Sequence, residues 1–136
     1  MRIMAIDYGD ARTGIAVSDA MGVLVGEAWV IKEYSAEKVA DAIAASAHER
    51  GVERLVLGYP LNMDGTVGPR AEKSLEMRDM LIEKTGLDVV MWDERRTTVA
   101  AHNILSENGR YGKKRKNSVD AVAASLILEG YLNSLK

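Results

Sequence analysis

The sequence predicts an α/β domain in which helices cover both faces of a five-stranded mixed sheet. Short apolar segments that end at turn residues or acids indicate strands, and apolar residues at helical spacing between the later segments indicate helices. The 136 residues fit one domain, spanning 1–136, and suffice to bury a substantial core.

The N-terminal part predicts three strands joined by short turns. Residues 2–7 form a short apolar run that ends on an acid, and residues 9–14 are rich in turn formers that should reverse the chain. Residues 15–18 and 23–31 are the next two expected strands. Consecutive strands with short connections predict an antiparallel meander.

Helices and strands alternate after this meander. Ser35 is a natural N-cap, and apolar residues recur at helical spacing from there to Gly51, which supplies a stop. Residues 55–58 predict a fourth strand, followed by a loop. Pro69 suits the first position of a second helix, which should end near Thr85.

The C-terminal part predicts a fifth strand and two more helices. The strand covers residues 88–92, a helix follows over 98–107, and a basic loop at 110–116 leads to a final helix from 118 to about 132. Because helices separate the later strands, these strands should pair in parallel through crossovers. The sheet is therefore expected to be mixed, with helices on its faces.

Composition narrows the classes of function. Without cysteine the chain has no disulfide or thiolate metal site, which suits a reducing cytoplasm, so any metal would take oxygen ligands, as Mg²⁺ and Mn²⁺ do. No stretch approaches the roughly 20 apolar residues of a membrane helix, and we expect no membrane partner. The net charge of −2 is unlike that of a nucleic-acid coat protein, but residues 110–116 hold five of the 18 basic side chains.

Two acids stand at the ends of predicted strands. Asp7 follows an apolar strand and needs a partner, a hydrogen bond or a cation; the alternative is that it binds amides of the turn at Gly9. Asp93 and Glu94 end the fifth strand and should point to opposite sides, so only one can face Asp7. The spacing leaves that choice open, and Arg95 could neutralise either acid.

The third acid, Asp120, begins a helix that is apolar nearly all round over residues 119–128, which predicts a buried helix. An acid in a first turn also stabilises the helix dipole, which is the simpler explanation. Three converging carboxylates would raise one another's pKa values, and divalent cations would remove that repulsion. We therefore expect a site for a pair of Mg²⁺ or Mn²⁺ ions that hydrolyses a phosphodiester bond.

Four segments around these acids resemble the YqgF-type family of bacterial proteins, which is similar to the RuvC Holliday-junction resolvases. In chain order they are DYGDARTGIA at 7–16, GYPLNMDGTVGPRA at 58–71, WDER at 92–95 with TT at 97–98, and VDAVAA at 119–124. Each segment is modest alone, but four in this order are specific, and the resemblance runs nearly end to end.

The resemblance implies a ribonuclease H-like fold in which Asp7, Glu94 and Asp120 are the catalytic residues and ligands of two metal ions. It selects Glu94 over Asp93. Members of the family are described as endonucleases that mature the 5′ end of the 16S ribosomal RNA precursor. A nucleic acid is thus the implied partner, either structured RNA, within a ribosomal particle, or four-way DNA.

Further motif residues are expected to bind substrate. Arg12 could grip a phosphate in bidentate fashion, or pair instead with Asp10 or Asp19. Gly9 permits a tight hairpin near a phosphate, and the basic segment suits sequence-independent phosphate contacts. The complete expected set is Gly9, Arg12, Asn62, Arg70, Arg95, Lys113, Lys114, Arg115 and Lys116.

Three other functions compete with a ribosomal RNA nuclease. A DNA junction resolvase would share the chemistry and act as a symmetric dimer, and the sequence leaves monomer and homodimer open. An ATPase of the actin and sugar-kinase type would need two such domains around a cleft. A non-catalytic ribosome-assembly or nucleic-acid-binding module would not require three intact acids.

Overall fold

The computed structural model describes residues 1–94 and 112–135, and within the second range it describes side chains from residue 121 onward. The elements, in chain order, are β1 (Ile3–Asp7), β2 (Arg12–Ser18), β3 (Val25–Lys32), α1 (Ala36–Arg50), β4 (Arg54–Tyr59), α2 (Pro69–Thr85), β5 (Asp88–Asp93) and α4 (Gly112–Ser134).

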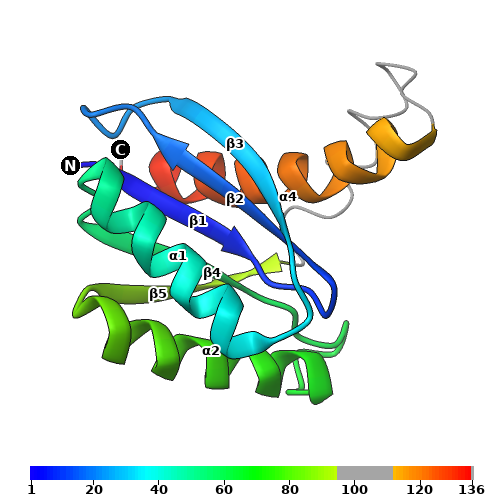
Figure 1. Ribbon diagram of the computed structural model, residues 1–136. Coiled ribbons are helices and arrows are strands. Elements are labelled where there is room, and N and C mark those ends of the chain that lie inside the picture. The colour runs from blue at the N-terminus through cyan, green and yellow to red at the C-terminus, as the bar shows by residue number, and fades with distance from the viewer. Residues whose placement is uncertain (95–111, 136) are drawn as a thin grey trace.

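The five strands form one mixed sheet in the order β3-β2-β1-β4-β5 (Figure 1). β1 pairs with β2, and β2 with β3, in antiparallel fashion, whereas β4 pairs in parallel with both β1 and β5. The predicted meander followed by parallel crossovers is confirmed. The ends of β1, β4 and β5 therefore meet at one edge of the sheet.

The second strand begins earlier than predicted. Residues 9–14 were expected to be a turn, but Arg12 already pairs with Lys32, and Gly14 pairs with Asp7 on one side and Val30 on the other. A glycine weakens the strand that contains it, but the strand still forms here because both neighbouring strands supply pairing partners. The turn itself is thus shorter than its composition indicated.

The first two helices have the predicted ends. The Ser35 side chain accepts a hydrogen bond from the amide of Lys38, and Gly51 ends α1 in the left-handed conformation at φ 66°. α2 has Pro69 in its first turn, and Gly86 ends it at φ 69°.

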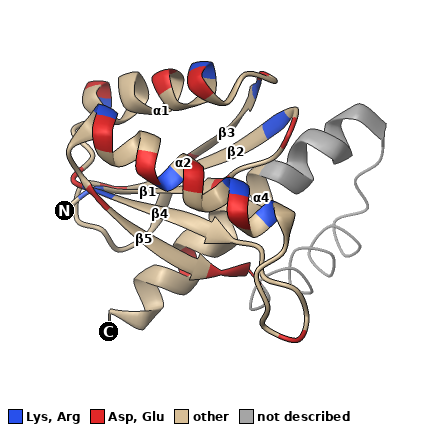
Figure 2. Cartoon of the chain, turned by 90° about the horizontal axis from the view of Figure 1, so that it is seen from below, with Lys and Arg blue, Asp and Glu red and all other residues tan. Residues whose placement is uncertain are grey.

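The helices lie in two layers around the sheet. α1 and α2 cover one face, and α4 covers the other (Figure 1). Side chains alternate along β1, so Met4 and Ile6 pack toward α1 and α2 while Ile3 and Ala5 pack toward α4. The outer surfaces of α1 and α2 carry interspersed acidic and basic residues (Figure 2). In the described ranges, no helix is long and apolar enough to cross a membrane.

The last helix differs from the prediction in two ways. It begins at Gly112, so the expected basic loop at 110–116 is helical from Gly112 onward. Lysine and arginine have helix propensities close to that of leucine, and a run of charge is therefore no evidence for a loop. The predicted helix over 98–107 lies outside the described residues.

The burial of α4 is also one-sided. Its described part buries a stripe at helical spacing, formed by Ala124, Ile127, Leu128, Tyr131 and Leu132. The intervening apolar residues, including Val122 and Leu126, are only half-buried. The sequence predicted a buried helix, but α4 forms an outer layer of the domain, and part of its apolar surface is only half-buried.

Candidate active site

Asp7 lies at the end of β1, on the face that α4 covers. Ile3 and Ala5 belong to the core cluster beneath α4, and Asp7 has the same parity along the strand. The side chain is partly buried. The strand thus places this carboxylate beside the apolar core rather than in bulk water.

Glu94 reaches the same place from β5. Val90 and Trp92 pack into the cluster under α4, so Glu94, two residues beyond Trp92, lies on that face, whereas Asp93 has the opposite parity. A hydrogen bond joins the carboxyl groups of Glu94 and Asp7. The register of β5 accounts for the choice between Asp93 and Glu94 that spacing alone left open.

The surroundings of Glu94 raise the pKa of its carboxyl group. Burial is the largest cause that raises its pKa, followed by the hydrogen bond to Asp7 and the negative charges of Asp7 and Asp93, and together they bring the pKa to about 9. The positive charge of Arg70 opposes this shift. At neutral pH the pair therefore holds a proton that a bound cation would replace.

Gly58 makes room for this pair. It is the fifth residue of β4, and a Cβ atom there would lie 2.8 Å from both the carboxyl carbon and Oε1 of Glu94. Real Cβ atoms essentially never approach so closely, so a larger residue must displace Glu94. Sequence reasoning missed this role, although a glycine at the end of a central strand was an available signal.

We expect Gly58→Ala to lower metal-dependent cleavage by about 10²-fold, because displacing a reacting group by about 1 Å has an effect of that size. The fold should survive, since only the Glu94 side chain must move. Gly26→Ala is the matched control, because a Cβ there would meet its neighbours at 3.5 Å, an ordinary contact. Cleavage rates and thermal melts of both variants test this, and a wild-type rate for Gly58→Ala would show that Glu94 need not stay in place.

The third predicted acid lies on the helix that covers the same face. α4 runs antiparallel to β1, so its N-terminal half, which includes Asp120, extends toward the edge where β1 and β5 end (Figure 1). The Asp120 side chain lies outside the described part of the structure. Among the described side chains, no group of three or more histidines or acids surrounds a potential metal position. The structure therefore brings two of the three predicted acids into contact.

The donor set of this pair fits a divalent cation. Both groups are carboxylates, which hard cations such as Mg²⁺ prefer, and a hydrogen bond joins the two. A cation between them would remove the repulsion that raises the pKa of Glu94. Asp7 and Glu94 can thus hold a metal ion on chemical grounds.

Two cations in the first turns of α2 lie near the edge where β1 ends. Arg70 is exposed in the first turn and acts electrostatically on Glu94. Lys73, one turn further along α2, donates a hydrogen bond of 3.0 Å to Oδ1 of Asp10, in the turn after β1. Arg70 was among the expected substrate contacts, but Lys73 was not. Its spacing of three residues from Arg70 could have indicated it.

The other expected contacts have varied surroundings. A Cβ at Gly9 would collide with the carbonyl oxygen of Arg12, so this turn requires glycine. Nε of Arg12 is buried with no hydrogen-bond partner among the described residues. Asn62 donates to Oγ1 of Thr66 at 2.9 Å and so stabilises its own loop. Arg95, and the side chains of the four basic residues at 113–116, lie outside what the structure describes.

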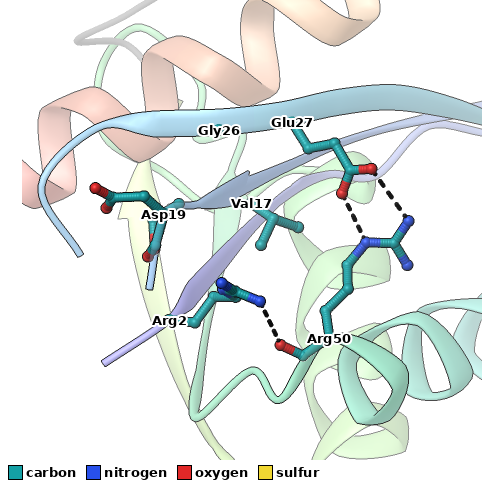
Figure 3. A pocket seen from close by; sticks show the side chains of 7 residues that line it. Arg2, Val17, Asp19, Gly26, Glu27 and Arg50 are labelled. Atoms are coloured by element: carbon teal, nitrogen blue, oxygen red, sulfur yellow. Dashed lines mark hydrogen bonds and ion pairs between the residues drawn. The ribbon is translucent and has the colours of Figure 1, made fainter. Parts of the chain in front are cut away.

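A separate pocket lies at the opposite edge of the sheet, where β1 begins (Figure 3). Its volume is about 210 Å³, and Arg2, Asp19, Glu27 and Arg50 are among its lining residues. Nε of Arg50 pairs with Glu27 at 2.8 Å, and Arg2 donates to the Arg50 carbonyl oxygen at 2.9 Å (Figure 3). These groups neutralise one another, and none belongs to the carboxylate pair.

Comparison with known proteins identifies the family to which the chain belongs. The RuvX family, described as Holliday junction resolvase, matches residues 1–134. The chain belongs to the RuvX family. A curated relative from Halothermothrix orenii, which bears the provisional name pre-16S rRNA nuclease, is 44% identical over 133 residues, or 98% of this chain and 95% of the relative. This RuvX-family chain therefore matches its relative over nearly the whole length of both.

Solved structures support the fold. Thermus thermophilus RuvC in complex with a Holliday junction substrate superposes with a TM-score of 0.62 at 14% identity, over 98% of this chain and 96% of that one. Fowlpox virus resolvase with Holliday junction DNA gives a TM-score of 0.62 at 13% identity, over 99% of each chain. The predicted ribonuclease H-like fold is confirmed for this member of the RuvX family.

Proposed function

We propose that this protein is a metal-dependent endonuclease that hydrolyses phosphodiester bonds in a nucleic acid. The observation that carries the proposal is the contact between Asp7 and Glu94 at the end of β1 and β5, on the face covered by the helix that bears Asp120. Membership of the RuvX family supports the same conclusion. We assign Asp7, Glu94 and Asp120 as the catalytic metal ligands.

The residues of this chain would perform distinct tasks. Asp7 and Glu94 would hold Mg²⁺ or Mn²⁺, with Asp120 as the third ligand and two ions as the expected number. When bound, these ions supply charge stabilisation at the phosphodiester oxygens and lower the pKa of water. The partly buried position of Asp7 and Glu94 limits competing solvent, and Arg70 would counter the charge of an incoming phosphate.

The substrate we favour is structured RNA, at the 5′ end of the 16S ribosomal RNA precursor. The name of the Halothermothrix orenii relative supports this choice, since the match extends over nearly the full length of both chains. A ribosomal particle in the cytoplasm would then present the substrate. Four-way DNA is the second candidate, supported by the description of the family and by the fold shared with resolvases.

A cleavage assay with the purified protein distinguishes between the two candidate substrates. A precursor RNA fragment that includes the 5′ end of 16S RNA and a four-way DNA junction of equal length would be incubated with Mg²⁺ or Mn²⁺. We expect specific cleavage of the RNA and little cleavage of the junction. Preferred cleavage of the junction, together with a symmetric dimer in sedimentation, would establish the DNA alternative. If the protein cleaved neither the junction nor the RNA, with the RNA supplied both bare and in precursor particles, the nuclease proposal would be wrong.

The proposed substrate contacts divide into two groups. Gly9, Arg12, Asn62 and Arg70 lie on the segments that follow β1 and β4, whereas Arg95 and the basic residues at 113–116 lie in the part of the sequence that leads to Asp120. Lysine and arginine bind phosphate without reading the base. We propose that the second group supplies most of the sequence-independent affinity.

Replacing Lys113, Lys114 and Lys116 with glutamine should weaken binding to RNA of unrelated sequences to a similar degree. Each lost phosphate contact reduces the slope of log affinity against log salt by about 0.7–0.9, so the slope should fall by about 2–3. Titrations between low and moderate salt would measure it. A selective loss for one sequence, with an unchanged slope, would contradict a phosphate role for these lysines.

A further inference from the structure

The loop between β4 and α2 presents an apolar side chain on a well-ordered turn. Met63 is 89% exposed, the highest value among the large apolar residues that the structure describes. The amide of Asn62 donates to the carbonyl of Thr66 at 2.9 Å, and the amide of Gly65 donates to the carbonyl of Asn62 at 2.8 Å. Oδ1 of Asp64 accepts from the amide of Thr66 at 3.0 Å. Hydrogen bonds thus order the turn that carries Met63, and its side chain is exposed on that turn.

Both ends of this loop adjoin Glu94. Gly58, the next-to-last residue of β4, approaches the Glu94 carboxyl group, and Arg70, the second residue of α2, acts electrostatically on the same group. The loop lies at the edge of the sheet where β1 ends (Figure 1). Five residues of chain span at most about 17 Å, so Met63 lies within about five nucleotide steps of the carboxylate pair along a bound strand.

The side chains at this edge suit two different parts of a nucleic acid: cations suit phosphates, and the exposed methionine suits a base. Arg70, exposed in the first turn of α2, carries a positive charge that attracts phosphates at this edge, whereas Lys73 is paired with Asp10. Met63 and Val67, which is 47% exposed, offer apolar surface against which a base can pack but a charged phosphate cannot. Apolar side chains, methionine included, insert between base steps in many nucleic-acid complexes and unstack them.

We propose that Met63 is a wedge that packs against an unstacked base within about five nucleotides of the scissile phosphate. This inference rests on the proposed nuclease function and deepens it, because it makes substrate structure a requirement. The wedge would favour RNA in which a helix ends or bulges near the cleavage position, since such bases unstack most readily. Short unstructured strands would gain little from it.

The test uses binding, so it does not depend on cleavage. In the Asp7→Asn background with Mn²⁺, precursor RNA would carry the fluorescent base 2-aminopurine at successive positions around the 5′ end of 16S RNA. We expect a fluorescence rise at one or two adjacent positions, which Met63→Ala abolishes and Met63→Leu retains. Met21→Ala is the matched control, because Met21 is 78% exposed on the β2–β3 hairpin at the opposite edge.

Cleavage provides the second measurement. In the otherwise wild-type protein, Met63→Ala should lower kcat/KM on structured RNA by about 10-fold, in line with contacts to single bases, and leave it unchanged on a short unstructured strand. Equal effects on both substrates, or no effect on fluorescence and structured RNA, would overturn the wedge while leaving the nuclease proposal intact. Failure of the wild-type protein to cut any nucleic acid would instead overturn the proposed function. Loss of binding to ribosomal protein but not to RNA would assign Met63 to a protein contact and also overturn the wedge.

Discussion

Asp7→Asn should reduce Mg²⁺- or Mn²⁺-dependent cleavage by at least about 10³-fold and leave the fold and most of the substrate affinity intact. The amide keeps the shape of the carboxyl group but removes the charge that would hold a cation against Glu94. Loss of one preorganised electrostatic contact in an active site commonly lowers the rate by 10²–10³-fold, and loss of a metal ligand should exceed that range. Single-turnover cleavage at saturating protein measures the rate, and filter binding measures the affinity.

A matched control separates this effect from a general loss of charge. Asp88 begins β5 at the other edge of the sheet, and its side chain is 84% exposed. Asp88→Asn should cleave at the wild-type rate, because an exposed pair with Arg54 at 4.0 Å contributes little. If Asp7→Asn retained full activity in either metal, Asp7 would not be a catalytic ligand, and the central proposal would be wrong.

Local sequence signals predicted those parts of the fold that depend on local physics. Ser35, Gly51, Pro69 and Gly86 mark helix ends through hydrogen bonds and backbone angles that involve only a few neighbouring residues. The antiparallel pairing of the first three strands and the parallel pairing of the later ones also followed from the connections between them. The start of β2 at Arg12 was missed because it depends on pairing with Lys32 at the far end of β3.

Local sequence patterns predicted less of the candidate site than of the fold. Asp7 and Glu94 were recognisable because each follows an apolar strand, but their contact depends on the parallel alignment of β4 with β1 and β5. The space that Gly58 leaves for Glu94 has no signature beyond the glycine itself. The pairing of Lys73 with Asp10 joins two segments 63 residues apart, which periodicity within one helix does not reveal.

The raised pKa of Glu94 predicts how the stability of the metal-free protein should depend on pH. In the unfolded chain a glutamate titrates near 4.5, but burial and Asp7 raise the pKa of Glu94 to about 9 in the folded state. The folded protein therefore binds the proton more tightly. This contribution to stability is fully present below pH 4.5 and is lost progressively as the pH rises from there to about 9.

Between pH 6 and pH 8 this one group should lower the free energy of unfolding by at most about 2–3 kcal/mol, since each pH unit changes it by up to 1.36 kcal/mol. Glu94→Gln, which is neutral at every pH, should flatten the dependence and make the metal-free protein more stable at pH 8. Urea unfolding of both proteins at several pH values, with a chelator present, would measure this. Saturating Mn²⁺ should also flatten the wild-type curve, because the cation replaces the proton between Asp7 and Glu94. An equally steep dependence in Glu94→Gln would mean that other groups set the pH response, and that the carboxylate pair is not under the strain that a metal would relieve.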